Sequence, residues 1–589
     1  MAVAIVVYYC STRGIFQGKA SGDGYFGFTY LPGLFHYHTF DFAPNSSFWV
    51  RYLGHEKTGH VANPCPIGPI FFWIPFYLLG LGLAALSTLL GIAKIALFEE
   101  SPFHYWMAGL GSLAAGLVGV ALMYRLLARH LSVGAARFGA IGATLASPLV
   151  WYFVTQPLYQ HATAFFMVTL LVERWDAWRS AMTPRRWALL GAIGGVAMLM
   201  RFQEGMWLLL PGLDLARDGL TAIGRRHWDA LGRVALSALL FVGVALVCFA
   251  PQLALWHWYY GFFRPAQPPG HMRWLEPGLV ATLFSTRAGL FPWIPMLYLV
   301  LPGLWLARRQ LQGLGGRMVL LFAVEVWVNS SAWDHWGSWA YGPRRFTDAT
   351  VVYSCGLAGF WTWIAERRMG KPIAAAIAAL TIAWNGLLME LVRNQKTKSS
   401  GAMATPASTW VGWAHGPRWL AGAFDRFGFP FCQPAGWIYG WIYGVPVRTF
   451  EGIVGNYILD RDSKIHAVRL VDGLDFASPG EFVREGITGP AEKGGLVPVA
   501  DRVRLLVPLA AREPLRMTLS GEFQQREGEV KAQWNGQPLP SEPHRGQVLF
   551  EVPKEIVKSR SSTNDLWLYL PPGARLKRLG LDSTTSWWQ

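Results

Sequence analysis

The sequence predicts a polytopic α-helical membrane protein of about eleven transmembrane helices, joined to a C-terminal all-β domain outside the cytoplasm. Of its 589 residues, 52% are hydrophobic and only 15% are charged, where soluble proteins average roughly 25% charged. The charge is uneven, because residues 446–589 hold 19 Lys/Arg and 18 Asp/Glu whereas residues 1–445 hold 33 and 18. Arginines punctuate the apolar runs, which is typical of topology signals and argues against a nucleic-acid-binding face. We therefore expect two domains, 1–445 in the membrane and 446–589 in water.

Ten apolar stretches are candidate membrane spans, because a hydrocarbon core of about 30 Å needs about 20 mostly apolar helical residues. They lie at 105–127, 137–154, 161–176, 187–200, 204–214, 234–258, 290–307, 318–332, 347–365 and 372–392. Basic clusters occupy every second connection, around Arg129, Arg179, Arg226, Arg308 and Arg367. Basic residues mark cytoplasmic connections, so the outside should hold everything after 392 and the connections 155–161, 201–204, 259–289 and 333–346.

Residues 1–10 would form the eleventh span, although ten apolar residues are too few to cross a bilayer alone. Either the true start lies upstream of Met1 or the helix extends toward Phe16. Parity then places a first extracytoplasmic loop at about 11–104. Its Pro-interrupted apolar stretch 69–97 is expected to form juxtamembrane helices at the interface or against the bundle. If this stretch crossed the membrane instead, residues 11–68 would be cytoplasmic.

The tail from residue 446 carries short alternating runs at 502–509, 515–519, 548–552 and 566–570, separated by turn-forming residues. Residues 534–536 (WNG) are a hairpin signal, and the pattern predicts a small β-sandwich. No internal repeat is evident. Cys65 and Cys432 could form a disulfide only if both face an oxidising compartment. The five cysteines show no metal-ligand spacing, so zinc is not indicated.

Polar residues gather in the connections expected outside, where five loops could close over one cavity. The clusters lie at 21–25, 155–161, 201–204, 259–289 and 333–346. Arginine can bind a phosphate or pyrophosphate in a bidentate manner, and an aspartate can take the proton of an attacking hydroxyl. A carboxylate facing arginines on one side of a membrane therefore suits the transfer of a phosphate-linked group.

Several of these motifs resemble the GT-C superfamily of polytopic glycosyltransferases. Residues 21–25 (SGDGY) are similar to the start of the family's first outer loop, which carries its acidic catalytic residue. Residues 63–80 (NPCPIGPIFFWIPFYLLG) resemble the juxtamembrane helix of the aminoarabinose and protein-mannose transferase branch, and 155–162 and 333–346 resemble uncharacterised bacterial members. The resemblance covers about residues 1–390. It implies a multi-pass protein of the bacterial inner membrane, with its active site and C-terminal domain on the periplasmic side.

The resemblance implies a catalytic role for Asp23, although a Gly-Asp-Gly segment is often only a turn. The candidate ligands of the donor phosphate are Arg201, Arg344, Arg345 and Arg287, each of which could instead anchor a helix end. The candidate substrate contacts are Tyr159, His161, Glu204, Asp334, His335 and Trp336; either histidine could simply be a satisfied hydrogen-bonding residue, and Glu204 could simply neutralise Arg201. Glu325 should lie buried within the bundle. Many relatives carry a pair of acids where this chain has Asp23 alone, so no metal ligand is assigned and a divalent metal ion stays an open alternative.

The implied function is an inverting glycosyltransferase that moves a sugar from a polyprenyl-phosphate donor to a hydroxyl of a glycan or glycolipid acceptor. The expected partners are that donor, that acceptor and the lipid bilayer, without nucleic acid. A transporter or flippase for lipid-linked sugars is an alternative, and it would line both leaflets with polar residues and carry inverted repeats. An O-antigen ligase or polymerase, and a non-catalytic glycan-binding scaffold, are further alternatives.

Overall fold

The computed structural model describes residues 1–11, 22–42, 58–92, 94–95, 101–265, 272–286, 288–332, 334, 337, 341–398, 429–447, 449–454, 474–476, 483–486, 497–498, 501–509, 512–559 and 562–583. The chain divides into two compact units. The first comprises Met1–Gln267, Met296–Glu325 and Arg344–Gly386, and the second comprises Pro268–Pro295, Val326–Pro343 and Leu387–Gln589.

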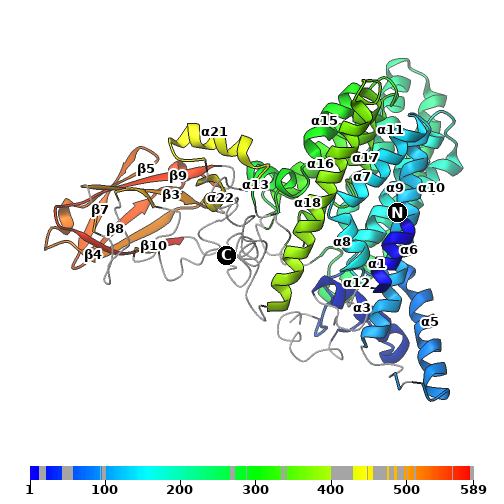
Figure 1. The fold of residues 1–589 in the computed structure, drawn as a ribbon, viewed down its shortest axis with the longest axis horizontal. Helices are drawn as coiled ribbons and strands as arrows, with labels where there is room; N and C mark the ends of the chain where they lie inside the picture. The colour runs from blue at the N-terminus through cyan, green and yellow to red at the C-terminus, as the bar shows by residue number, and fades with distance from the viewer. Residues whose placement is uncertain are drawn as a thin grey trace. The chain divides into compact units, whose positions relative to one another are not determined.

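Helices form most of the described chain before residue 400 (Figure 1). They are α1 (Ala2–Ser11), α3 (Asp23–Pro32), α5 (Ile70–Leu89), α6 (Pro102–Ala128), α7 (Val133–Leu145), α8 (Leu149–Val154), α9 (His161–Trp178), α10 (Pro184–Met200), α11 (Leu209–Gly224), α12 (Trp228–Tyr260), α13 (Leu279–Phe284), α14 (Leu290–Trp293), α15 (Leu297–Leu306), α16 (Leu314–Ser331), α17 (Thr350–Ile364) and α18 (Gly370–Lys398). Every predicted span falls on helix, which confirms the helical part of the prediction. The stretch 137–154 is divided into α7 and α8 just before Pro148, since a proline disfavours helical geometry in the residue that precedes it.

Local sequence explains where several helices begin. Ser101, Ser132 and Thr183 each accept a hydrogen bond from the backbone N–H three residues further on, at 3.2–3.3 Å. Pro102 and Pro184 follow two of these caps at the first helical position, where the missing N–H costs nothing. Such caps satisfy donors that the first turn leaves unpaired, so these helix starts are encoded locally.

Small residues let the helices of the first unit approach closely. A Cβ atom added at Gly191 of α10 would lie 2.2 Å from the carbonyl oxygen of Phe241 in α12. A Cβ atom at Gly303 of α15 would lie 1.9 Å from the carbonyl oxygen of Gly356 in α17. Close approach through small residues is typical of membrane helix pairs, which have little hydrophobic driving force in lipid.

Within the described part of the chain, four helices are long and apolar enough to cross a membrane by length and composition: Ile70–Leu89, Pro102–Ala128, Trp228–Tyr260 and Gly370–Glu390. The other predicted spans are also helical but are shorter or interrupted. For example, α7 and α15 are apolar but have only 13 and 10 residues. The fold is therefore a polytopic helical bundle in which several segments are broken helices.

The packing register of α5 bears on the prediction for 69–97. A Cβ atom at Gly80 would contact Met107, and a Cβ atom at Gly111 would contact the backbone of Phe72, so α5 runs antiparallel to the first third of α6. The remaining half of α5 extends past the start of α6 (Figure 1). The juxtamembrane role of 69–97 stays a prediction, because α5 is itself long and apolar enough to cross a membrane.

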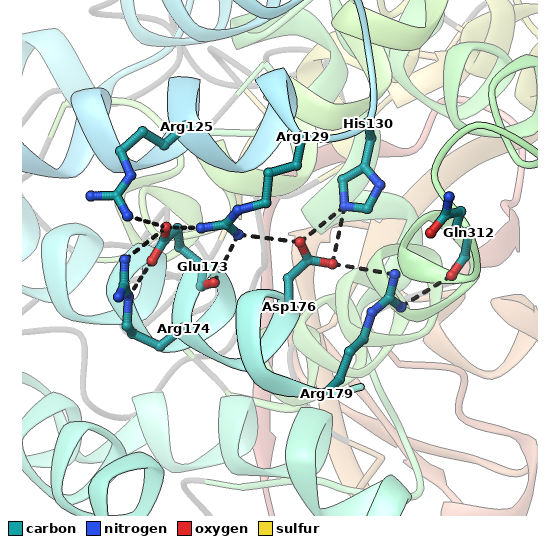
Figure 2. A network of polar contacts seen from close by, with 8 residues as sticks. All are labelled: Arg125, Arg129, His130, Glu173, Arg174, Asp176, Arg179 and Gln312. Atoms are coloured by element: carbon teal, nitrogen blue, oxygen red, sulfur yellow. Dashed lines mark hydrogen bonds and ion pairs between the residues drawn. The ribbon is translucent and has the colours of Figure 1, made fainter. Parts of the chain in front are cut away.

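At the opposite end of α6 a network of ion pairs joins the connections predicted to be cytoplasmic (Figure 2). The buried carboxylate of Glu173 in α9 pairs with Arg125 at 3.0 Å and also with Arg129 and Arg174. Asp176, one turn further, pairs with His130 at 2.9 Å. The C-terminal ends of α6 and α9 therefore lie at the same end of the bundle, as the alternation of basic connections requires.

The described residues of the second unit form two five-stranded antiparallel sheets, which confirms the predicted all-β domain. One has the order β1-β10-β4-β8-β7 and the other β2-β3-β9-β5-β6. The strands are β1 (Leu474–Asp475), β2 (Val483–Glu485), β3 (Arg502–Pro508), β4 (Leu515–Glu522), β5 (Lys531–Trp534), β6 (Gln537–Leu539), β7 (Ser541–His544), β8 (Gln547–Val552), β9 (Thr563–Tyr569) and β10 (Arg575–Ser583), preceded by helices α21 (Gln433–Tyr443) and α22 (Thr449–Ile453). The predicted hairpin joins β5 to β6, with φ of 52° at Asn535 and 81° at Gly536, as a two-residue hairpin turn requires.

Candidate functional site

Asp23 and Arg344 form an ion pair at the end of the bundle opposite the network in Figure 2. Asp23 is the first residue of α3, and Arg344 begins the short helical turn Arg344–Phe346 just before α17. The Arg344 guanidinium donates a hydrogen bond to the Asp23 carboxylate. The arginine side chain is 14% exposed and the carboxylate 36%, so the aspartate is the more accessible partner.

Tyr159 forms one wall beside this pair. A Cβ atom at Gly22, whose φ is +55°, would lie 2.7 Å from the Tyr159 hydroxyl, so this position needs a glycine. The Arg344 guanidinium lies 5.8 Å from the centre of the Tyr159 ring, within the range of a cation–π contact. The SGDGY segment is therefore more than a turn, since its glycines admit the aromatic ring beside Asp23.

The Asp23 carboxylate affects the pKa values of both Tyr159 and Arg344. Burial raises the pKa of Tyr159, and the Asp23 carboxylate acts in the same direction, so the phenol stays a hydrogen-bond donor. Burial opposes the charge of Arg344, but Asp23 and the neighbouring tyrosines more than offset it and leave the arginine pKa above its usual value. The site therefore holds a permanent cation beside a carboxylate, which suits a phosphate ligand.

Residues 63–65 form hydrogen bonds with the backbone of α3, the helix that begins at Asp23. The thiol of Cys65 donates to the Asp23 carbonyl oxygen at 3.3 Å. The Asn63 amide donates to the carbonyl oxygen of Phe26 at 2.6 Å and accepts the Cys65 backbone N–H at 2.9 Å. Cys65 and Cys432 are both free and buried thiols, so the disulfide considered above is not formed. Asn63, which precedes Pro64, therefore holds α3 against the segment 63–65.

His161 lies next to the short helical turn that begins at Arg344. Its Nδ1 lies 3.0 Å from the Thr347 hydroxyl, which donates at 2.9 Å to the Arg344 carbonyl oxygen. The ring lies 4.3 Å from the ring of Tyr152, and Nε2 is buried with no hydrogen-bond partner among the described residues. His161 is therefore linked to the Arg344 carbonyl oxygen through the Thr347 hydroxyl.

Arg201 forms ion pairs with two buried carboxylates. Its guanidinium lies 3.1 Å from Glu204 and 3.6 Å from Asp348, and both acids are fully buried. Trp207 donates to the other oxygen of Asp348 at 2.8 Å. This arrangement favours the structural interpretation, in which Glu204 neutralises Arg201, over a free cation for phosphate. Sequence reasoning missed Asp348, whose only signal was an acid near the start of the predicted span 347–365.

Of the remaining predicted site residues, the structure describes Arg345 and Asp334. Arg345 follows Arg344, and its carbonyl oxygen accepts a hydrogen bond from Gln203 at 3.4 Å. Asp334 is buried in the second unit. Glu325 is fully buried, as predicted. Arg287, His335 and Trp336 lie outside the described residues. Among the residues that are described, no group of three or more His, Cys, Asp or Glu could hold a metal ion.

The described residues form a polytopic helical membrane protein, in which four helices are long and apolar enough to cross a membrane. The ion pair of Asp23 and Arg344 at one end of the bundle marks a candidate site. No family model and no curated protein matches the chain. Among solved structures, the chain is similar to ArnT from Cupriavidus metallidurans in the apo state, with 16% identity over 72% of this chain and 68% of that chain and a TM-score of 0.40. It is also similar to ArnT from Cupriavidus metallidurans bound to undecaprenyl phosphate, with 18% identity over 75% of this chain and 71% of that chain and a TM-score of 0.38. The chemistry of this chain is read from its own residues.

Proposed function

We propose that the chain transfers a sugar from a polyprenyl-phosphate-linked donor to a hydroxyl of a glycan or glycolipid acceptor, at the extracytoplasmic face of the bacterial inner membrane. The observation that carries the proposal is the ion pair of Asp23 and Arg344, which joins an accessible carboxylate to a buried cation. A base and a phosphate ligand are the two groups that this transfer requires.

In the proposed reaction the donor phosphate binds the Arg344 guanidinium and replaces the Asp23 carboxylate there. The acceptor hydroxyl attacks the anomeric carbon from the face opposite the phosphate, so that the configuration inverts. As the new C–O bond forms, Asp23 takes the hydroxyl proton and the bond from the anomeric carbon to the phosphate oxygen breaks. Arg344 stabilises the negative charge that develops on the leaving phosphate. Phosphate is a good leaving group, so no general acid is needed.

Tyr159 supports this chemistry by position. Its ring lies against the arginine and its protonated hydroxyl lies beside Gly22, next to the base. A phenol in this place can donate a hydrogen bond to a sugar hydroxyl or a phosphate oxygen. The aromatic face covers part of the Arg344 guanidinium, while the Asp23 carboxylate stays accessible to an acceptor.

The test is Asp23→Asn in proteoliposomes supplied with a panel of undecaprenyl-phosphate-linked sugars, with release of undecaprenyl phosphate as the readout. We expect the rate to fall by about 10²–10⁴, the usual contribution of a general base. Asp41→Asn is the matched control, because that carboxylate also lies in the first loop but accepts from His60 and Val61 instead. Full activity of Asp23→Asn would remove the base from the mechanism. Turnover only of pyrophosphate-linked donors would favour the ligase alternative, and transport without release would favour the flippase.

A further inference from the structure

Helix α21 of the second unit contains a short tandem repeat that sequence reasoning missed. Residues 436–439 and 440–443 both read Gly-Trp-Ile-Tyr. A repeat of four is close to the helical period of 3.6, so residues of the same type lie one turn apart on the same face. The helix therefore has one face of glycine and tyrosine and another of tryptophan and isoleucine.

The glycine and tyrosine face packs against the β domain. The Tyr439 hydroxyl lies 3.0 Å from that of Thr563 in β9, and the Tyr443 hydroxyl accepts the Thr563 backbone N–H at 3.1 Å. A Cβ atom at Gly436 would lie 2.9 Å from Val447, so the glycine permits close packing against the turn that follows the helix. Arg504 of β3 donates to the Tyr443 carbonyl oxygen at 2.9 Å. These contacts fix which face points away from the domain.

The opposite face is apolar and open. Its side chains have exposed fractions of 61% for Trp437, 61% for Ile438, 85% for Trp441 and 59% for Ile442. Among the described residues of 429–583, the other exposed large hydrophobic side chains are those of Val447 and Val497. A patch confined to one helix on an otherwise polar domain marks an interaction surface.

The chemistry of this face fits a lipid surface better than a glycan. Residues 429–447 contain no charged residue, and the four side chains offer only indole N–H groups as polar atoms. A glycan needs several hydrogen-bonding partners around an aromatic platform, whereas tryptophan prefers the boundary between head groups and acyl chains and isoleucine prefers the acyl chains themselves. The same chain also carries helices long and apolar enough to cross a bilayer, so the β domain is covalently joined to segments that can lie in a membrane.

We propose that α21 is a membrane-surface anchor, in which Trp437, Ile438, Trp441 and Ile442 enter the interfacial layer of the outer leaflet and hold the β domain on the bilayer. The tyrosine face stays on β9 and β3, so anchoring needs no change in the domain. The bilayer is thus the partner of this surface.

The experiment uses the full chain in nanodiscs of phosphatidylethanolamine and phosphatidylglycerol, in a Cys10→Ser background that removes the exposed native thiol. Trp441→Cys carries an environment-sensitive fluorophore. Glu551→Cys on β8, with a side chain that is 71% exposed, is the matched control. Quenching is measured with lipids that carry a spin label near the head group and with iodide in the water.

We expect the spin-labelled lipid to quench the label at position 441 about threefold more strongly than at 551, and iodide to quench it correspondingly less. Equal quenching of both positions by iodide would show a face open to water and would overturn the proposal. Protection of position 441 from both quenchers would show that protein covers the face, and it would overturn the proposal equally. The Cys10→Ser protein without an introduced cysteine gives the background signal.

Discussion

The carboxylate of Asp23 accepts a hydrogen bond from Arg344, a residue 321 positions further along the chain. Each partner compensates a charge that would otherwise be costly to hold near the protein interior. If the donor phosphate replaces the carboxylate at this guanidinium, the base becomes free only when the donor is bound. One ion pair would then couple donor binding to activation of the acceptor and limit wasteful reaction with water.

The first prediction concerns Arg344. Arg344→Ala should lower kcat/KM for the lipid donor by about 10²–10³, since it removes a group that stabilises charge on the leaving phosphate. Arg344→Lys keeps the charge but loses the planar fork, so its loss should be intermediate. Arg367→Ala is the matched control, because that arginine is exposed and stacks 3.6 Å from the Trp363 ring. Equal activity of Arg344→Ala and the control would refute the phosphate role.

The second prediction tests whether Arg201 stabilises the fold or binds the donor phosphate. Arg201→Met should destabilise the protein by about 3–5 kcal/mol, because it leaves two buried carboxylates without their cation. The triple variant Arg201→Met, Glu204→Gln and Asp348→Asn should recover thermal stability, with the donor KM changed by no more than about threefold. A recovered fold with a donor KM raised more than about tenfold would return Arg201 to the phosphate site.

The helices and the β domain could be predicted from sequence because both depend on local pattern. Apolar runs of span length and the alternation of basic connections located the helices, and the turn at Asn535 and Gly536 located the hairpin. The same pattern indicated that Asp23 and Arg344 would lie at one end of the bundle. Sidedness alone brings such residues into one layer, and their direct contact emerged only from the packed structure.

Side-chain pairing could not be predicted, because it depends on packing between elements distant in sequence. Arg201 could equally bind phosphate or a neighbouring acid until Asp348 was seen beside it. Cys65 gave no sequence signal for its contact with the Asp23 carbonyl oxygen. The repeat in α21 was readable from the sequence, but which of its faces is exposed depends on the contacts with β9.

A third prediction tests the ion-pair network at the other end of the bundle (Figure 2). Glu173→Gln leaves Arg125, Arg129 and Arg174 without the buried carboxylate that holds them together. Because these arginines are 25–55% exposed and can be hydrated, unfolding should become easier by about 1.5–3 kcal/mol. Asp218→Asn, in a side chain that is 50% exposed, should change stability by less than about 1 kcal/mol. Thermal unfolding of the purified proteins measures both. Similar stability of the two variants would show that the network contributes little.

A fourth prediction follows from the burial of Cys65. Burial raises the pKa of this thiol well above its usual value, and the Asp23 carboxylate acts in the same direction. Below a pH of about 8.5 the thiol is neutral in both folded and unfolded states; above it only the unfolded thiol ionises, so stability falls by up to about 1.4 kcal/mol per pH unit. Cys65→Ala should therefore lose less stability between pH 8 and 10 than the unchanged protein. Cys10→Ala, which removes an exposed thiol, should lose as much stability as the unchanged protein. Parallel losses in all three would show that Cys65 does not ionise on unfolding in this range.

The fifth prediction is that the two ends of the bundle face opposite compartments. One end of the bundle carries α3 with Asp23 and is predicted to lie outside, and the other end carries the basic connections, such as that around Arg225. In intact spheroplasts of a Cys10→Ser strain, an impermeant maleimide should label His36→Cys, whose side chain is exposed, without permeabilisation. It should label Arg225→Cys only after the membrane is permeabilised, because arginine-rich connections are retained in the cytoplasm. Labelling of both from the same side would place the base and the predicted cytoplasmic connections in one compartment. A lipid-linked donor presented on the outer leaflet could then not reach the site as proposed.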